Sequence, residues 1–516
     1  MPATPDAPRG AATFLFERYS AGWRAVLLCL AAGALVTASL APFGFWPAGI
    51  IAALLLRALL EDQSRRTIMW RSWLFGVGLF GSGTSWVYVS IQEHGHASVP
   101  LASLLIVLFT FGLALFNLIA GWLYSFTSHR QAGWNWLLFP ACWVLGEWLK
   151  SWLLTGFPWL FLGYAHLATP LAGWAPLSGV LGISFAVALT GSILYQLLKS
   201  RRPRQLVLLI PLALLWLGGA GLRHIDWVTP SGEPVQVAMI QPDIQQAIKW
   251  RPESYNQIIS SYLKQTEALW GTEIIVWPEA AIPRLYQNAT PLLEQLDRKA
   301  KNSGSTLITG IPYRAAAVGD SRPDLYNSVV ALGQGSGIYF KQHLVPFGEY
   351  VPLEHWLRGL IAFFDLPMSS FSWGPAEQAP LRAGERSLAP FVCYEVVYPA
   401  LVAHDSQRAE FILTVSNDSW FGRSIGPHQH FEIARMRALE NGRYLIRGTN
   451  NGISGLVDHR GAVMLSAPQF TRTVLQGTVV PMQGTTPFGR WGNLPTILLA
   501  LALTLFAALP RAAKTS

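Results

Sequence analysis

Long apolar segments constrain the fold of this 516-residue chain more than any other feature of its sequence. Apolar residues make up 51% of the chain and charged residues only 13%, whereas about a quarter of a soluble protein is charged. A helix needs roughly 17–25 mostly apolar residues to cross a bilayer, so we predict a polytopic α-helical membrane domain of about eight transmembrane helices. These helices are expected at residues 25–41, 43–60, 72–91, 98–126, 134–150, 172–198, 205–222 and 493–510.

Basic residues between the apolar segments predict how the chain crosses the membrane. The net charge is +9, and the Lys and Arg residues form short clusters on alternate flanks instead of one basic patch, so nothing supports nucleic-acid binding. By the positive-inside rule the clustered flanks face the cytoplasm, which places both termini there and residues 223–490 outside. In a Gram-negative cell, that domain would be periplasmic and the protein would lie in the bacterial inner membrane. The first segment is expected to be a retained anchor.

Residues 223–490 differ in pattern from the rest of the chain. Short β-rich runs such as Val235–Gln241 and Phe411–Val415 alternate with expected helices such as Pro252–Trp270. This alternation predicts an α/β domain. The chain then divides into a transmembrane domain at residues 1–222, a catalytic domain at 223–490, and a final transmembrane helix with a short cytoplasmic tail at 491–516.

Three residues of the catalytic domain carry groups that can do chemistry. Glu279, Lys341 and Cys393 each come directly after an expected strand. Open α/β sheets place their sites at the carboxyl ends of strands. Taken singly, each residue has a simpler interpretation: a loop glutamate in water, a surface lysine and an inert core thiol.

Only one of the three cysteines, Cys393, lies outside the apolar segments. No CxxC spacing exists, so the cysteines predict neither a disulfide framework nor a metal site. Cys393 ends a strand and precedes a possible helix at Glu395–Val402. Backbone N–H groups at a helix start can lower the pKa of a thiol and stabilise an oxyanion, so a reactive thiol is expected here.

The order Glu, Lys, Cys, with separations of 62 and 52 residues, resembles the catalytic triad of the nitrilase superfamily. Within that superfamily the chain resembles the apolipoprotein N-acyltransferases, through the segments WPEAAIP, HLVPFGEYVP, CYE and SNDSWFG. The resemblance extends over the membrane segments. It implies an α/β nitrilase-like domain folded as a four-layer α-β-β-α sandwich, with Glu279, Lys341 and Cys393 as the catalytic residues.

The resemblance also implies a specific reaction. Glu279 would be the general base, Cys393 the nucleophile, and Lys341 the cation that stabilises the oxyanion. Cys393 would take the sn-1 acyl chain of a phospholipid, typically phosphatidylethanolamine, as a thioester. The α-amine of the N-terminal diacylglyceryl-cysteine of an apolipoprotein would then accept the chain in a ping-pong cycle of lipoprotein maturation. No metal or other cofactor is implied.

Further residues match positions that support the site in this family. Two acidic residues would orient Lys341 or stabilise the intermediate, an Asn and a Tyr would assist the site, and a Trp on a mobile arm would cover the pocket. A second Trp is expected to line it. For each aromatic residue, simple packing is an equally good interpretation. The two acidic residues are Glu349 and Glu395, and the Asn and the Tyr are Asn327 and Tyr394. The Trp on the mobile arm is Trp250, and the Trp expected to line the pocket is Trp420.

The run WLRGLIAFFDLPMSSFSW, at residues 356–373, is too apolar for an exposed loop of a soluble enzyme. Exposed apolar patches of this kind usually mark a protein or membrane contact. We expect a lid at the outer leaflet, carrying Phe363 and Phe364, that guides acyl chains to Cys393. The alternative interpretation is a buried helix of the catalytic domain.

Two other functions fit parts of the sequence. A membrane-tethered amidase or nitrilase-type hydrolase would use the same triad and pass the acyl group to water, but the apolar segments and the lid favour a lipid donor. A transporter would place ionisable residues inside the membrane, where Arg57 and Glu147 are the main candidates. We therefore expect a membrane-embedded acyltransferase, and a monomer because nothing in the sequence demands a partner subunit.

Overall fold

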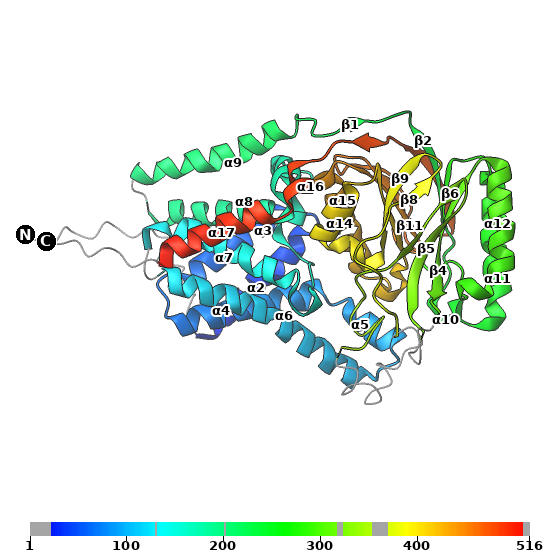
Figure 1. The fold of residues 1–516 in the computed structure, drawn as a ribbon. Helices are drawn as coiled ribbons and strands as arrows, with labels where there is room; N and C mark the ends of the chain where they lie inside the picture. Colours follow the sequence, from blue (N-terminus) through cyan, green and yellow to red (C-terminus); the bar gives the residue numbers. More distant parts are fainter. Residues whose placement is uncertain (1–21, 129–131, 201–202, 317–322, 353–369, 509–516) are drawn as a thin grey trace, which may run out of the picture. The chain divides into compact units, whose positions relative to one another are not determined.

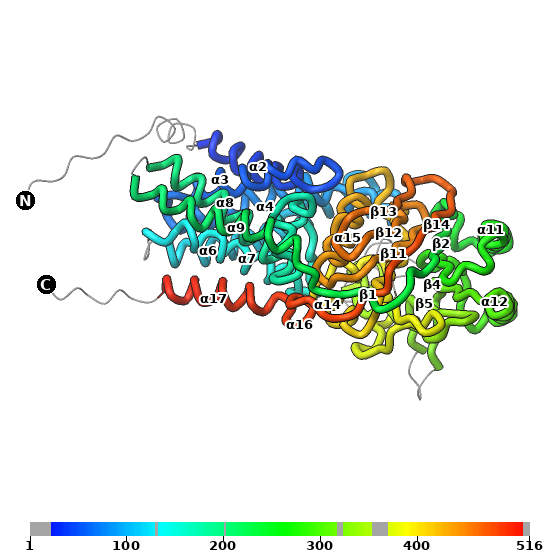
Figure 2. The backbone as a smooth tube through the Cα atoms, turned by 90° about the horizontal axis from the view of Figure 1, so that it is seen from above, coloured from blue at the N-terminus to red at the C-terminus, as the bar shows by residue number. Residues whose placement is uncertain are grey.

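The computed structural model describes residues 22–128, 132–200, 203–316, 323–352 and 370–508. The chain divides into two compact units, shown in Figures 1 and 2. The first unit consists of Met1–Ser85, Leu104–Ile225 and Asn493–Ser516, and the second of Trp86–Ser103 and Asp226–Gly492. The division expected from the sequence did not include Trp86–Ser103 in the second unit.

Helices with mostly apolar residues build the described part of the first unit (Figure 1). They are α2 (Gly22–Ser39), α3 (Pro47–Leu60), α4 (Arg65–Gly83), α6 (Val99–Ser128), α7 (Asn135–Lys150), α8 (Ala175–Lys199), α9 (Leu209–Leu222) and α17 (Leu494–Ala508). A Cβ atom on Gly33 would lie 2.0 Å from the carbonyl oxygen of Phe75, and one on Gly78 would lie 2.1 Å from that of Leu30. Because small residues let membrane helices approach closely, these two glycines allow α2 and α4 to pack against each other.

Fewer helices are long enough to cross a bilayer than the sequence predicts. Among the described residues, length and hydropathy select four: Gly22–Ser39, Val99–Ser128, Pro170–Lys199 and Pro203–Leu222. A fifth results if α4 and the short helical segment Val87–His94 form one broken span. Each of the eight expected segments contains a helix, but α3 and α17 have only 14 and 15 residues. The number of eight spans therefore remains a proposal.

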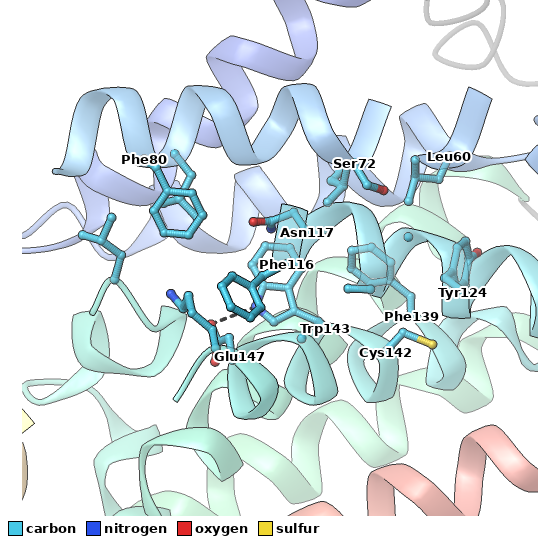
Figure 3. Close-up of a pocket in the computed structure, with 17 residues that line it drawn as sticks. Leu60, Ser72, Phe80, Phe116, Asn117, Tyr124, Phe139, Cys142, Trp143 and Glu147 are labelled. Atoms are coloured by element: carbon cyan, nitrogen blue, oxygen red, sulfur yellow. Dashed lines mark hydrogen bonds between the residues drawn. The ribbon is translucent and has the colours of Figure 1, made fainter. Parts of the chain in front are cut away.

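A small cavity lies among α3, α4, α6 and α7 (Figure 3). Its volume of about 50 Å³ is room for a few water molecules. Glu147 in its wall accepts a hydrogen bond from the Trp143 indole at 3.0 Å. Lys150 donates to the Trp159 carbonyl at 2.5 Å and lies 4.9 Å from the centres of two phenylalanine rings. Glu147 and Lys150 thus both have polar or aromatic partners, as buried charges require. The cavity itself is too small for a transport pathway.

Two β-sheets form the centre of the second unit (Figure 1). Within the described residues, the first sheet has six strands, in the order β14 (Thr473–Val479), β2 (Val235–Gln241), β3 (Ile274–Val276), β4 (Thr306–Arg314), β5 (Leu325–Gly333) and β7 (Ile338–Phe340). The second has seven, in the order β13 (Val463–Ser466), β12 (Gly455–Val457), β11 (Tyr444–Thr449), β10 (Phe411–Ser416), β9 (Arg386–Val392), β8 (Leu381–Ala383) and β6 (Gly335–Ser336). Strands β2, β3 and β4 run parallel, as do β9, β10 and β11, so their carboxyl ends meet at one edge of each sheet.

Alternation of side chains along the strands fills two apolar cores. In β2, Val237 and Met239 belong to the core that joins the two sheets. Ala238 and Ile240 point the other way, as successive residues of a strand do, into the core shared with α11 and α12. The expected strand at Val235–Gln241 coincides with β2.

Helices cover the outer face of each sheet. The helices α11 (Tyr255–Thr266) and α12 (Thr290–Ser303) lie side by side against the first sheet (Figure 2). On α12, the buried side chains Leu293, Leu296 and Ala300 follow helical spacing, and charged residues fill the solvent face. The helices α14 (Pro399–Ser406) and α15 (Gly426–Asn441) lie beside the second sheet (Figure 1).

The segment before α6 packs inside the second unit through polar contacts. It contains one π-helical turn, η1 (Ser90–His94). The Ser90 hydroxyl donates to the Trp420 carbonyl at 2.7 Å, and the His94 ring lies edge-on to the Trp420 ring at 5.2 Å. These contacts explain why residues 86–103 belong to the unit that holds the candidate site.

Candidate active site

The three candidate catalytic residues lie just beyond the ends of three strands. Glu279 follows β3, Lys341 follows β7, and Cys393 follows β9. All three side chains are largely buried, with 8%, 1% and 9% of their surface exposed. Lys341 Nζ lies 3.9 Å from Glu279 Oε1, and the charges of both residues act on the Cys393 thiol. The two sheets thus bring together residues that are 62 and 52 positions apart in the sequence.

Both oxygens of the Glu279 carboxylate accept hydrogen bonds. Oε1 accepts from Asn327 Nδ2 at 2.7 Å, and Oε2 accepts from the Asn417 N–H at 2.8 Å. Its backbone carbonyl accepts from the buried Lys249 at 3.0 Å. Burial raises the pKa of Glu279, against the positive charges of Lys341 and Lys249. A carboxylate with a raised pKa and a fixed orientation is suited to accepting a proton.

A second carboxylate holds Lys341 in place. Lys341 Nζ pairs with Glu349 Oε2 at 2.7 Å, while Glu349 Oε1 accepts from Asn327 Nδ2 at 2.9 Å. Burial opposes the charge on Lys341, but the carboxylates of Glu349 and Glu279 together raise its pKa above the ordinary value. The lysine therefore stays protonated. Asn327 links the two carboxylates from a position between them.

Cys393 occupies a strained backbone position at the start of a single 3₁₀ turn, η11 (Cys393–Val397). Its φ of +53° lies in the left-handed region, which is uncommon for non-glycine residues. The expected helix at Glu395–Val402 is divided into this turn and α14. The expectation of a lowered thiol pKa is wrong: burial raises the pKa of Cys393, the Glu279 carboxylate raises it further, and Lys341 opposes both. The resting thiol is therefore neutral and needs a base.

Glu395 fixes the backbone on both sides of the site. Its Oε1 accepts from the Tyr339 hydroxyl at 3.0 Å and from the N–H groups of Gln342 and His343 at 2.6 and 3.1 Å. Its Oε2 accepts from the Val392 N–H at 2.7 Å. Burial raises the pKa of Glu395 to about 7, against the Lys341 charge and the backbone donors. Glu395 therefore joins the backbone that follows Lys341 to the last residue of β9, Val392, which directly precedes Cys393.

Changing Glu395→Gln should weaken the connection between the backbone that follows Lys341 and the end of β9. Whichever way the new side-chain amide is turned, its NH2 group faces other donors. These are the Val392 N–H in one orientation and the three donors around Oε1 in the other. Leaving buried donors unsatisfied costs about 1–3 kcal/mol of unfolding free energy, and a small misplacement of Cys393 lowers the acylation rate by about 100-fold. Thermal unfolding and single-turnover acylation measure the two effects. Wild-type values for both would exclude a positioning role.

The other expected site residues have different surroundings. Asn327 lies between the two carboxylates, and the Tyr394 ring is buried edge-on to Tyr398 at 5.3 Å. Trp250 follows the short helix α10 (Gln246–Lys249), with the Lys249 ammonium 5.9 Å from its ring. The roles expected for Tyr394, Trp250 and Trp420 stay predictions. The lid residues Phe363 and Phe364 lie outside the described residues.

Several residues at the site carried no signal on their own in the sequence. Lys249 stands next to Trp250, and nothing in its local sequence indicates its hydrogen bond to the Glu279 carbonyl. Asn417 acts through its backbone N–H, which no side-chain pattern reveals. Tyr339 is read as a strand residue, although its hydroxyl reaches Glu395. Each of these contacts joins segments at least 30 residues apart, so only the folded chain identifies them.

Two family models match the chain. That of the apolipoprotein N-acyltransferase N-terminal domain matches residues 32–193, and that of the carbon-nitrogen hydrolases matches residues 236–486. The second unit is thus a carbon-nitrogen hydrolase domain. Among solved structures, Nit3 of Saccharomyces cerevisiae has a TM-score of 0.36 at 16% identity and covers 50% of this chain and 93% of its own. An amidase from Nesterenkonia sp. has a TM-score of 0.33 at 18% identity, covering 49% and 93%.

Curated relatives match this chain along almost its whole length. The apolipoprotein N-acyltransferase of Pseudomonas syringae pv. tomato is 46% identical over 96% of this chain and 98% of its own. The one of Azotobacter vinelandii is 46% identical over 96% of both chains, and the one of Pseudomonas aeruginosa is 45% identical over 95% and 96%. The chain belongs to the apolipoprotein N-acyltransferase family and is an acyltransferase.

Proposed function

We propose that this enzyme moves an acyl chain from a membrane phospholipid to the α-amine of an N-terminal diacylglyceryl-cysteine on a lipoprotein. Phosphatidylethanolamine is the proposed donor, through its sn-1 chain. The observation that carries the proposal is the buried pair of Lys341 and Glu279 beside the strained Cys393 thiol. Relatives named apolipoprotein N-acyltransferase, which match over 96% of the chain, support lipoprotein as the acceptor.

In the first half-reaction Cys393 becomes acylated. Glu279 takes the thiol proton, and the thiolate attacks the ester carbonyl of the phospholipid. The oxyanion that forms faces the ammonium of Lys341, which stabilises it. When the intermediate collapses, the C–O bond breaks, and the lysophospholipid leaves with the proton that Glu279 returns. The thioester on Cys393 remains.

In the second half-reaction the acceptor amine attacks this thioester. Glu279 removes a proton from the amine, and Lys341 again faces the oxyanion. The C–S bond breaks as the amide bond forms. Cys393 leaves as a thiolate and regains a proton from Glu279. The enzyme then returns to its starting state without consuming another reactant.

The proposal extends to the membrane arrangement. We propose eight spans, both termini in the cytoplasm, and the catalytic domain on the periplasmic side of a bacterial inner membrane. The apolar helices of the first unit and the alternating basic clusters support this topology. A four-layer α-β-β-α arrangement of the second unit is supported by its two cores and by α14 and α15, which lie beside the second sheet. The proposed enzyme acts as a monomer.

A membrane-tethered hydrolase is the weaker alternative, because the relatives along the whole chain are named acyltransferases. The two reactions differ only in the second nucleophile. An acyl-enzyme that decays in water alone, without acceptor, would favour the hydrolase.

Mass spectrometry of the detergent-purified protein tests the proposed function. After incubation with phosphatidylethanolamine alone, the peptide that contains Cys393 should gain one hydroxylamine-labile acyl mass. A diacylglyceryl peptide should discharge it within one turnover. The Cys393→Ala variant, as the control, should gain no mass. Turnover of lipid with an unmodified Cys393 would refute the nucleophile assignment.

A further inference from the structure

A second buried polar cluster lies behind the nucleophile. It consists of Asp418, His430 and Arg447, and none of the three side chains exposes more than 1% of its surface. Arg447 Nη2 donates to Asp418 Oδ2 at 2.9 Å and lies 3.0 Å from His430 Nδ1, while Asp418 Oδ1 lies 3.1 Å from the same ring nitrogen. The catalytic steps above use none of these groups directly.

The cluster reaches the nucleophile through one hydrogen bond. His430 Nε2 lies 3.1 Å from the backbone carbonyl oxygen of Cys393. Because a carbonyl only accepts, Nε2 carries the hydrogen in either charge state of the ring. Burial and the Arg447 charge lower the pKa of His430, which favours the neutral ring, whose Nδ1 accepts from Arg447. In this state Asp418 acts on the ring through Arg447, to which it is paired.

The segment that contains Asp418 also reaches Glu279, the proposed base. Asp418 follows Asn417, whose N–H donates to Glu279 Oε2 at 2.8 Å. Of the two residues that follow β10, Asn417 therefore donates to the Glu279 carboxylate, and Asp418 pairs with Arg447, which donates to the His430 ring. Phe421, at the end of the turn η12 (Asp418–Phe421), packs edge-on against the His430 ring at 5.9 Å.

We propose that His430, held by the Arg447 donor that pairs with Asp418, is a positioning residue that fixes the Cys393 carbonyl and so aims the thiol at the substrate ester. A left-handed φ at a cysteine persists only when its surroundings hold it. The hydrogen bond from Nε2 restrains the peptide plane that follows Cys393, on the side of Cys393 opposite to the contact of Glu395 with the Val392 N–H. This inference rests on the proposed role of Cys393 as the nucleophile.

Two substitutions at His430 separate positioning from packing. The His430→Gln amide nitrogen can replace Nε2 as the donor, whereas His430→Leu fills similar space without a donor. We expect His430→Leu to lower the single-turnover acylation rate of Cys393 by about 100-fold, and His430→Gln to recover about tenfold of that loss. The apparent KM for phospholipid should stay unchanged. His428→Leu, two residues earlier on α15, is the matched control and should keep the wild-type rate.

The outcomes are distinct. Equal rates for His430→Leu and wild type, or equal losses in the Leu and Gln variants, would overturn the positioning role. If His430→Leu does not fold, His430→Asn replaces it: this amide is polar but too short to reach Cys393, so it should be as slow as expected for Leu while Gln recovers. Absence of any acyl mass on Cys393 in the wild type would instead refute the proposed function itself.

Discussion

Replacing Glu279 with glutamine is expected to lower the rate of Cys393 acylation by about 1,000-fold or more, because the amide cannot take the thiol proton. Burial raises the pKa of the thiol, so little thiolate exists near neutral pH without a base. The substitution also turns one of two acceptor oxygens into a donor beside Asn327 and Asn417, which costs about 1–3 kcal/mol of unfolding free energy. Single-turnover acylation and chemical denaturation measure the two effects.

Glu273→Gln is the matched control for this experiment. Glu273 stands just before β3, the strand that Glu279 follows, and its exposed carboxylate accepts from the Gln236 N–H at 2.8 Å. The same loss of charge at this exposed residue should leave the acylation rate unaltered. If Glu279→Gln also keeps the wild-type rate, another group deprotonates the thiol. Lys249 would be the first candidate, because burial lowers its pKa to about 8.

The parts of the site that local sequence specifies are the ends of strands. Apolar runs predicted β2 and β3, and parallel strands place their carboxyl ends at one sheet edge. The strand ends therefore place Glu279, Lys341 and Cys393 each at an edge of its own sheet, whereas their meeting across the two sheets was implied only by the family resemblance. The contact of Glu349 with Lys341 was expected from the family resemblance alone, and the structure pairs them at 2.7 Å.

Features that depend on long-range contacts could not be predicted in this way. Three of the four hydrogen bonds of Glu395 come from Tyr339, Gln342 and His343, which are 52 to 56 positions away and meet it only in the folded chain. The thiol pKa of Cys393 depends on burial, which outweighs the expected effect of a helix start. Hydropathy predicted one span at residues 72–91, but α4 ends at Gly83, and the apolar residues after it pack in the second unit.

Replacing Lys341 with methionine is expected to have the second large effect. Methionine has similar length but no charge, so the carboxylates of Glu279 and Glu349 lose the cation between them. Removing one partner of a buried ion pair costs about 3–5 kcal/mol of stability, and losing a group that stabilises an oxyanion lowers the acylation rate by about 100–1,000-fold. Differential scanning calorimetry and single-turnover kinetics with phosphatidylethanolamine measure these losses.

The variant should also respond differently to pH. Lys341 is the strongest of the groups that lower the pKa of Glu279, so its removal raises that pKa further. Residual activity requires the ionised carboxylate and should therefore appear at higher pH than in the wild type. A carboxyl whose folded pKa lies above its unfolded pKa binds protons more readily in the folded state. The variant should accordingly regain stability as the pH falls through the folded pKa.

Combining Lys341→Met with Glu349→Gln separates the structural and the catalytic role of this lysine. The second substitution removes one of the two carboxylates left without a cation, so the double variant should recover part of the lost unfolding free energy. Its acylation rate should stay low, because no positive charge faces the oxyanion. Recovery of the rate together with the stability would mean that Lys341 serves only to neutralise Glu349 and Glu279. The proposed oxyanion stabilisation would then have to come from backbone N–H groups near Cys393.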